Sequence, residues 1–187
     1  MEKKTSKMEN ELAALPRRAQ VAFAAICAER ALREGAKYTK HDVLNDARLR
    51  QALDFAWRYV EGEEVDYHAE MESTHIAIAK AIPNLDDPDA EETLMQIMSA
   101  VARTLLTFQD PPKAPAAASS TANSLLDLVA LLYEDPQQAM NNEKAWLEKA
   151  INLLKQWGEK PLSRHMFDAI PEYERGPLFS FFTDSDN

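Results

Sequence analysis

This chain contains little glycine, a single cysteine and no long apolar run. Its four glycines in 187 residues leave no glycine-rich loop that could hold a phosphate group. The lone Cys27 excludes an internal disulfide and fits a reducing compartment. No segment reaches the roughly 18 apolar residues of a membrane span, and no apolar stretch typical of a secretory signal follows Met1. We therefore expect a cytoplasmic protein that has no membrane partner.

Apolar residues recur at helical spacing along the chain, and no segment alternates in the manner of a β-strand. The helices predicted from this spacing cover about 16–33, 40–61, 65–81, 88–108, 120–133 and 136–157, with a short helix at 163–168. The 120–133 helix is apolar on most sides, so we expect it near the centre. The sequence thus predicts an all-α fold, a single compact bundle of six to seven helices in one domain.

Three segments are expected to stand apart from these helices. We expect residues 1–10 to be disordered and residues 183–187 to form a flexible acidic tail. Residues 109–118, with the sequence QDPPKAPAAA, are rich in proline and alanine and are the best candidate for an internal joint. Ser119, Ser120 or Thr121 is then expected to cap the helix that follows the joint.

The negative charge of the chain is concentrated in one segment. Residues 61–110 contain twelve carboxylates against Lys80 and Arg103, so this segment alone accounts for the net charge of −10. Such a field attracts a basic partner and repels nucleic acid and anionic lipid. The arginines of residues 1–60 are spread over two helices without interleaved aromatic residues, so they do not indicate a nucleic-acid surface.

Apolar side chains lie between these carboxylates and could anchor a protein partner. The residues predicted to bind that partner are Glu61, Glu63, Glu64, Asp66, Tyr67, Glu70, Met71, Asp86, Asp87 and Glu91. A solvated acidic surface without a partner is the alternative interpretation, and the sequence does not separate the two. The oligomeric state is not indicated by the sequence either.

Two stretches carry a resemblance to known proteins. The first is LPRRAQVAFAAICAERAL at residues 15–32, and the second is STANSLLDLVALLYEDPQQA, which begins at Ser120. Together they resemble the YjaG-like family of bacterial proteins, which is helical and has no established activity. A related group with a similar first helix occurs among the immunity proteins of bacterial polymorphic toxin systems. That resemblance implies a protein that protects the producing cell by binding a toxin, and it implies no catalytic residue.

One histidine-containing pattern could bind a metal. His68, Glu72 and His75 stand at i, i+4 and i+7, and Glu64 precedes His68 by one helical turn. The Glu72-x-x-His75 pair matches the ligand pairs of di-iron helical bundles, but those sites need a second such pair, which this chain lacks. We therefore expect no bound metal and no cofactor, and interpret the pattern as a solvated helix face.

Other reactive side chains give weaker signals. Glu29 and Arg30 follow an apolar run, where a buried glutamate could hydrogen-bond a neighbouring helix or act as a general base. The interpretation that we prefer is that both side chains reach from the core edge to water. Cys27 is expected to be a small buried hydrophobic residue rather than a nucleophile. His41 and His165 lie near predicted helix ends with no recognisable partner.

The sequence therefore favours a binding protein without enzymatic activity. Its most specific form is an immunity protein that neutralises a cognate bacterial toxin with a basic surface, through the acidic segment. One alternative is a cytosolic housekeeping protein of the uncharacterised family. The other is a helical metalloenzyme that uses Glu64, His68, Glu72 and His75.

Overall fold

The computed structural model describes residues 6–36, 47–66, 88–109, 111–157, 162–173 and 176–177. Its α-helices are α1 (Lys7–Ala13), α2 (Arg17–Gly35), α3 (Ala47–Glu61), α5 (Pro88–Gln109), α6 (Ala114–Leu132) and α7 (Pro136–Trp157). Two 3-10 helices, η2 (Pro111–Lys113) and η3 (Arg164–Ala169), complete the described elements. No strand is present in these ranges, and none of their helices has the length and apolar character to cross a membrane. The predicted all-α bundle is confirmed.

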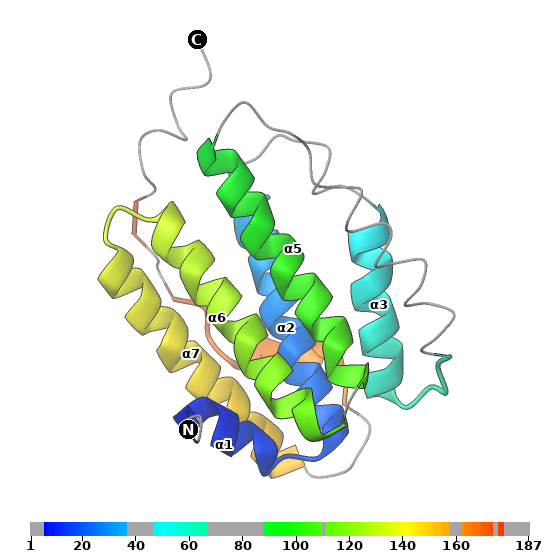
Figure 1. Cartoon of the computed structure of the whole chain (residues 1–187). Coiled ribbons are helices and arrows are strands. Elements are labelled where there is room, and N and C mark those ends of the chain that lie inside the picture. Colours follow the sequence, from blue (N-terminus) through cyan, green and yellow to red (C-terminus); the bar gives the residue numbers. More distant parts are fainter. Residues whose placement is uncertain are drawn as a thin grey trace, which may run out of the picture.

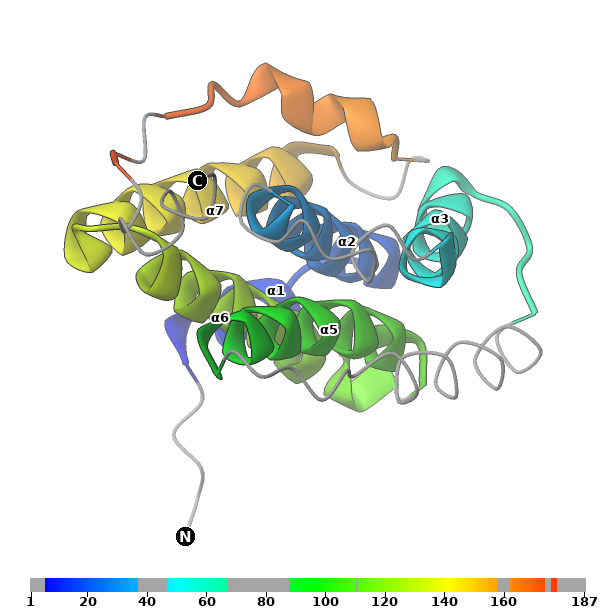
Figure 2. The same ribbon diagram turned by 90° about the horizontal axis from the view of Figure 1, so that it is seen from above.

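Helix α2 occupies the middle of the bundle. Figure 2 shows α5 and α6 below it, α3 and α7 on its two flanks and the segment that contains η3 above it. Along α2, the side chains from Ala19 to Ala25 are all buried, and Phe23 is fully enclosed. The many alanines of this helix let neighbouring helices approach on several sides, because a methyl side chain is small enough for two helix backbones to pack closely.

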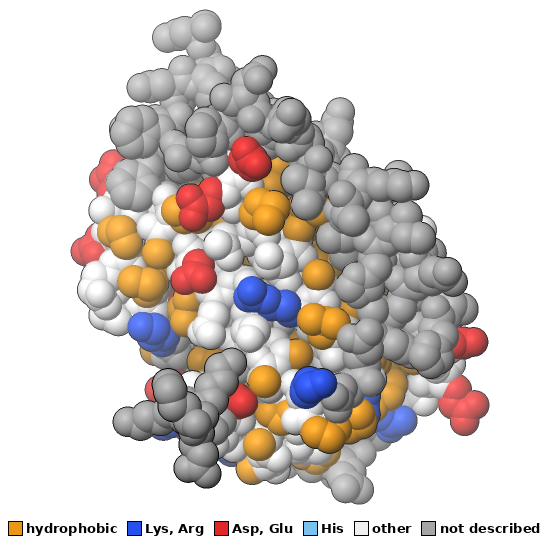
Figure 3. Space-filling view, viewed as in Figure 1, with side chains coloured by type: hydrophobic (Ala, Val, Ile, Leu, Met, Phe, Trp, Pro, Cys, Tyr) orange, Lys and Arg blue, Asp and Glu red, His pale blue; other side chains and the backbone are white. Residues whose placement is uncertain are grey.

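The prediction of a central 120–133 helix is only partly right. Helix α6 packs against α1, α2, α5 and α7, and Leu128 on it is fully buried. However, Asn123 and Asp127 are exposed, so one stripe of α6 forms the outer surface of the bundle (Figures 1 and 3). The central helix is α2. The sequence did not indicate this, because α2 is rich in alanine and alanines contribute little to an apolar pattern.

Several helix ends lie where the sequence places them. Helix α7 covers the predicted 136–157, and Asp135 caps it by accepting a hydrogen bond from the Gln138 amide at 2.9 Å. Helix α3 ends at Glu61, because Gly62 adopts a φ of +104° that favours glycine. Helix α5 corresponds to the predicted 88–108, and the short helix at 163–168 is the 3-10 helix η3.

Two predicted segments are corrected by the structure. Residues 7–10 belong to α1 rather than to a disordered region, since Ser6 caps this helix at the Glu9 amide and Leu12 anchors it in the core. The joint is shorter than predicted, because α6 begins at Ala114 with Pro115 in its first turn, not at residues 119–121. Proline is tolerated there, since the first-turn amides have no partner within the helix.

Other predictions fall wholly or partly outside the described residues. Of the predicted helix over 65–81, only Val65 and Asp66 are described, and neither is helical. Glu64, which was predicted to lie one helical turn before His68, is not helical either. The predicted tail at 183–187 lies outside the described ranges.

Candidate functional site

An ion pair between α2 and α7 lies inside the bundle. The side chains of Arg30 and Glu143 are 2% and 0% exposed. Arg30 donates from Nε to Glu143 Oε1 at 2.7 Å and from Nη2 to Oε2 at 3.1 Å. This is the bidentate geometry in which a guanidinium and a carboxylate bind most strongly. The preferred prediction that Arg30 reaches from the core edge to water is therefore wrong.

Neighbouring side chains complete the coordination of this pair. The Nη1 of Arg30 donates to Glu172 Oε1 at 2.8 Å, and the hydroxyl of Tyr173 donates to Glu143. The guanidinium of Arg30 also lies 3.7 Å from the ring centroid of Trp146, where the ring face attracts a cation. Charges that are removed from water are tolerated only with such complete pairing, so this cluster holds α2, α7 and the 172–173 segment together.

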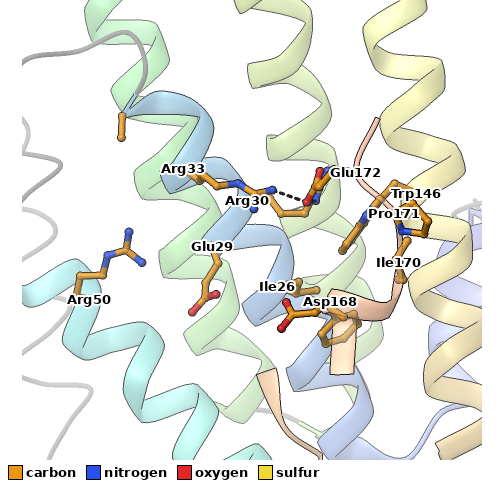
Figure 4. Close-up of a pocket in the computed structure, with 12 residues that line it drawn as sticks. Ile26, Glu29, Arg30, Arg33, Arg50, Trp146, Asp168, Ile170, Pro171 and Glu172 are labelled. Carbon is orange, nitrogen blue, oxygen red and sulfur yellow. Dashed lines mark hydrogen bonds and ion pairs between the residues drawn. The ribbon is translucent and has the colours of Figure 1, made fainter. Parts of the chain in front are cut away.

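A pocket of about 530 Å³ opens beside the buried pair (Figure 4). Helix α2, the first turn of α3, helix α7 and the segment around η3 each contribute to its wall. The lining residues are Ile26, Glu29, Arg30, Arg33, Ala36, Arg50, Trp146, Phe167, Asp168, Ile170, Pro171 and Glu172. A volume of this size is in the range of pockets that hold small molecules.

The three carboxylates of the pocket each have a partner. Glu172 binds both Arg30 and Arg33, each at 2.8 Å. Glu29 accepts a hydrogen bond from Trp57 Nε1 at 2.8 Å and lies 3.6 Å from Arg164.

The third carboxylate, that of Asp168, lies 3.3 Å from His165 Nδ1. In contrast, Arg50 has no ion pair or hydrogen bond from its side chain to any residue that the structure describes, and its side chain is exposed. Of the described residues that line the pocket, Arg50 is therefore the one guanidinium without a carboxylate partner.

The charge state of Glu172 is set by two opposing effects. Burial raises its pKa, but Arg30 and Arg33 outweigh burial and hold the pKa below its ordinary value of 4.5. The unfolded chain therefore binds a proton at a higher pH than the folded chain does, and stability rises with pH in this range. The contribution of Glu172 is complete above the unfolded pKa and is lost as the pH falls through the lowered folded value.

We therefore expect Glu172→Gln to lower the melting temperature at about pH 7 and to lose much of this effect below about pH 4. Thermal unfolding of the wild type and the variant at a series of pH values is the measurement. Glu148→Gln, at an exposed position of α7, is the control and should change the melting temperature little at either pH. An equal loss by Glu172→Gln at both pH values would contradict this role.

Neither Cys27 nor His165 is among the residues that line the pocket. Burial raises the pKa of the Cys27 thiol well above its usual value, and the nearby Glu143 adds to this effect, so Cys27 is a buried thiol as predicted. Within the described ranges, no three His, Cys, Asp or Glu side chains converge as metal ligands would. His165 lies exposed on η3 beside Asp168, while His41, His68, Glu72 and His75 are outside the described residues.

The predicted partner-binding residues fall into three groups. Glu61, Glu63, Glu64 and Asp66 are exposed where α3 ends, and Glu91 is exposed near the start of α5. Tyr67, Glu70, Met71, Asp86 and Asp87 lie outside the described residues. We call Glu61, Glu63, Glu64 and Asp66 the α3-end cluster.

The described groups lie at opposite ends of the bundle. The rings of Tyr59 and Phe108 are in contact at 5.0 Å, so the α3-end cluster lies near the end of α5. Glu91 is 17 residues earlier in the same helix, which corresponds to about 25 Å along its axis. In Figure 1, α3 ends at the lower right of the bundle, whereas α5 begins at the top. The described members therefore do not form one cluster.

No known protein family, curated protein or solved structure matches this chain. The resemblance of residues 15–32 to the YjaG-like family and to immunity proteins therefore stays a prediction.

Sequence reasoning missed Glu143 and undervalued Arg30. A signal for both was present in the helical spacing. Ala139, Trp146 and Ala150 place Glu143 on the apolar face of α7, and Arg30 stands among the buried residues of α2. Opposite charges at core positions of two helices indicate a buried pair, because an unpaired charge would not be tolerated there.

Proposed function

We propose that this protein binds a basic protein partner through the α3-end cluster, and more specifically that it is an immunity protein that occludes a toxin. The observation that carries the proposal is the surplus of carboxylates on this surface. Glu63 binds Arg58 at 2.7 Å, but the exposed Glu61 and Glu64 have no ion-pair partner among the described residues. A complementary basic surface would supply the missing partners.

The position of the α3-end cluster at the end of a helix makes its electrostatic potential more negative. The C-terminal end of a helix carries a partial negative charge, which repels carboxylates placed beside it. Glu61 is the last residue of α3, and Glu63, Glu64 and Asp66 follow within the next five residues. Arg58 is the basic residue of the last turn and offsets only part of this charge. Binding of a cationic surface would therefore relieve repulsion in the free protein.

Charge of this kind acts mainly on the rate of association. Long-range attraction raises the encounter rate with a basic partner, and steric occlusion of the partner's active site follows once the surfaces meet. The toxins that such a mechanism suits are those acting on nucleic acids or nucleotides, since their clefts are basic.

Reversing the charge of the α3-end cluster should slow association with the partner. We expect Glu61→Lys/Glu64→Lys to lower the association rate constant about tenfold or more at low salt and to weaken its salt dependence. The dissociation rate should change less, because rim charges contribute little once the surfaces are in contact. The measurement is surface-based binding kinetics at two salt concentrations, with the purified toxin domain encoded by the neighbouring gene.

Glu91→Lys/Glu92→Lys is the matched control, because it changes the net charge by the same amount at the other end of the bundle. This control should leave most of the association rate intact, and both variants should keep the helical circular dichroism of the wild type. Equal slowing by both variants would assign the effect to net charge rather than to the α3-end cluster. Unchanged kinetics in Glu61→Lys/Glu64→Lys would remove the cluster from the interface.

The immunity function has a separate test in cells. Co-expression of the wild-type protein should protect cells from the neighbouring toxin, and Glu61→Lys/Glu64→Lys should protect them less when both proteins are produced at low levels. A neighbouring gene that encodes no toxin, or a toxin that kills despite the wild-type protein, would contradict the immunity function. Binding of another basic protein by the α3-end cluster would then still support the broader proposal.

A further inference from the structure

We propose that the pocket beside Arg30 binds a small organic monocarboxylate with an aromatic or branched apolar body. The proposal does not depend on the immunity function, because the pocket and the α3-end cluster are different surfaces and their tests use different partners. It rests on the unpaired charge, the apolar wall and the size of the pocket.

The charged side of the pocket selects an anion. Its carboxylates are already bound by other side chains, whereas Arg50 on α3 is unpaired within the described residues. In Figure 4, Arg50 stands on the α3 side of the pocket, apart from Arg33 and Glu172. A guanidinium presents a planar set of donors that matches a carboxylate, so this is the position for the anionic head.

The opposite side of the pocket suits an apolar body. Trp146, Phe167 and Ile170 form the base of this wall, but they are 3%, 3% and 8% exposed, so most of the accessible apolar surface belongs to the half-buried Ile26 and the exposed Pro171. Pro171 and Ile26 extend the same apolar lining. Aromatic and aliphatic surfaces of this kind gain free energy when they contact an apolar ligand.

A buried donor on this wall also lacks an acceptor. The indole Nε1–H of Trp146 has no hydrogen-bond partner among the residues that the structure describes, although the atom is buried. Buried donors are almost always paired, so among the described residues this indole N–H is an exception. Trp146 lines the pocket, and its indole resonance is therefore a local reporter of an occupant.

The charge of the ligand is limited by the pocket itself. Glu29, Asp168 and Glu172 line the space, and among the described lining residues only the guanidinium of Arg50 is unpaired. A single negative charge matches Arg50, whereas a doubly charged phosphate monoester would be repelled more strongly by the three carboxylates. This balance favours a carboxylate over a phosphate.

The probes are phenylacetate, its uncharged analogue phenethyl alcohol, and phenyl phosphate. Titration calorimetry with the full chain should show saturable binding of phenylacetate with a dissociation constant of about 0.1–1 mM. The same titration followed by nuclear magnetic resonance should shift the indole N–H signal of Trp146. Phenethyl alcohol and phenyl phosphate should each bind at least about tenfold more weakly.

Variants of α3 then test the role of Arg50. Arg50→Gln should weaken phenylacetate binding about tenfold, and Arg50→Lys should recover part of the loss because it keeps the charge but not the planar donors. Arg58→Gln is the matched control on the same helix, since Arg58 does not line the pocket, and it should bind like the wild type. Both positions are exposed, so these variants should fold normally.

Four results would overturn the proposal. The first is the absence of saturable phenylacetate binding up to about 10 mM. The second is phenethyl alcohol binding as tightly as phenylacetate, which would make the pocket an unspecific apolar one. The third is phenyl phosphate binding more tightly, and the fourth is unchanged affinity in Arg50→Gln. Each of these results leaves the proposed binding of a basic protein untouched.

Discussion

Replacing Glu143 with alanine should lower the free energy of unfolding by about 3–5 kcal/mol. The variant leaves the guanidinium of Arg30, 2% exposed, without its main counter-charge, and it removes the acceptor of the Tyr173 hydroxyl. The cost of an unpaired charge inside the bundle is the physical reason for this large effect. Chemical denaturation at neutral pH, followed by circular dichroism, is the measurement.

A double variant separates the ion pair from simple packing. Arg30→Met/Glu143→Leu replaces both charges by apolar groups of similar size, and it should recover most of the stability lost by Glu143→Ala. Glu148→Ala, at an exposed position of the same helix, is the control and should cost less than about 0.5 kcal/mol. A loss for Glu143→Ala as small as that of Glu148→Ala would mean that Arg30 and Glu143 are not buried together.

Leu128→Ala should lower the free energy of unfolding by about 2–5 kcal/mol. Leu128 is fully buried on the side of α6 that faces the core, so the variant loses apolar contact and leaves a cavity. Leu131→Ala on the same helix should cost less, because Leu131 is only partly buried. The measurement is again the denaturation midpoint, with the slope of the transition checked for two-state behaviour.

The comparison of the two leucines also tests the orientation of α6. Equal losses for Leu128→Ala and Leu131→Ala would mean that α6 is enclosed on both sides, as the sequence alone predicts. A loss below about 0.5 kcal/mol for Leu128→Ala would place this helix at the periphery. Only a large loss for Leu128→Ala with a smaller one for Leu131→Ala agrees with an outer stripe on α6.

Local chemistry made many helices predictable. Asp135 followed by Pro136 marks the start of α7, and Gly62 marks the end of α3, because capping and positive φ depend on the residues at the site itself. The start of α6 was not predictable from composition. A proline-rich and alanine-rich stretch serves equally as a joint or as the first turns of a helix, and packing of Ala114 and Ala118 against the core decides between them.

The candidate pocket depended on contacts that the sequence does not show. Arg30 is 113 residues from Glu143 and 142 residues from Glu172 along the chain. Each was visible as a charged residue, but their pairing depends on the angle and offset at which α2 meets α7. The same holds for Arg50, whose lack of a described partner is known only once the other arginines have been placed.

By itself the sequence determined the all-α class, the ends of several helices and the concentration of negative charge between residues 61 and 110. These properties follow from residue types and short spacings along the chain. Only the tertiary structure decided that α2 is the central helix, that Arg30 is buried against Glu143, and that the acidic residues around Glu61 and Glu91 lie at opposite ends. The reason is that burial, ion pairing and surface clustering depend on the distances between helices, which the spacing within each helix does not specify.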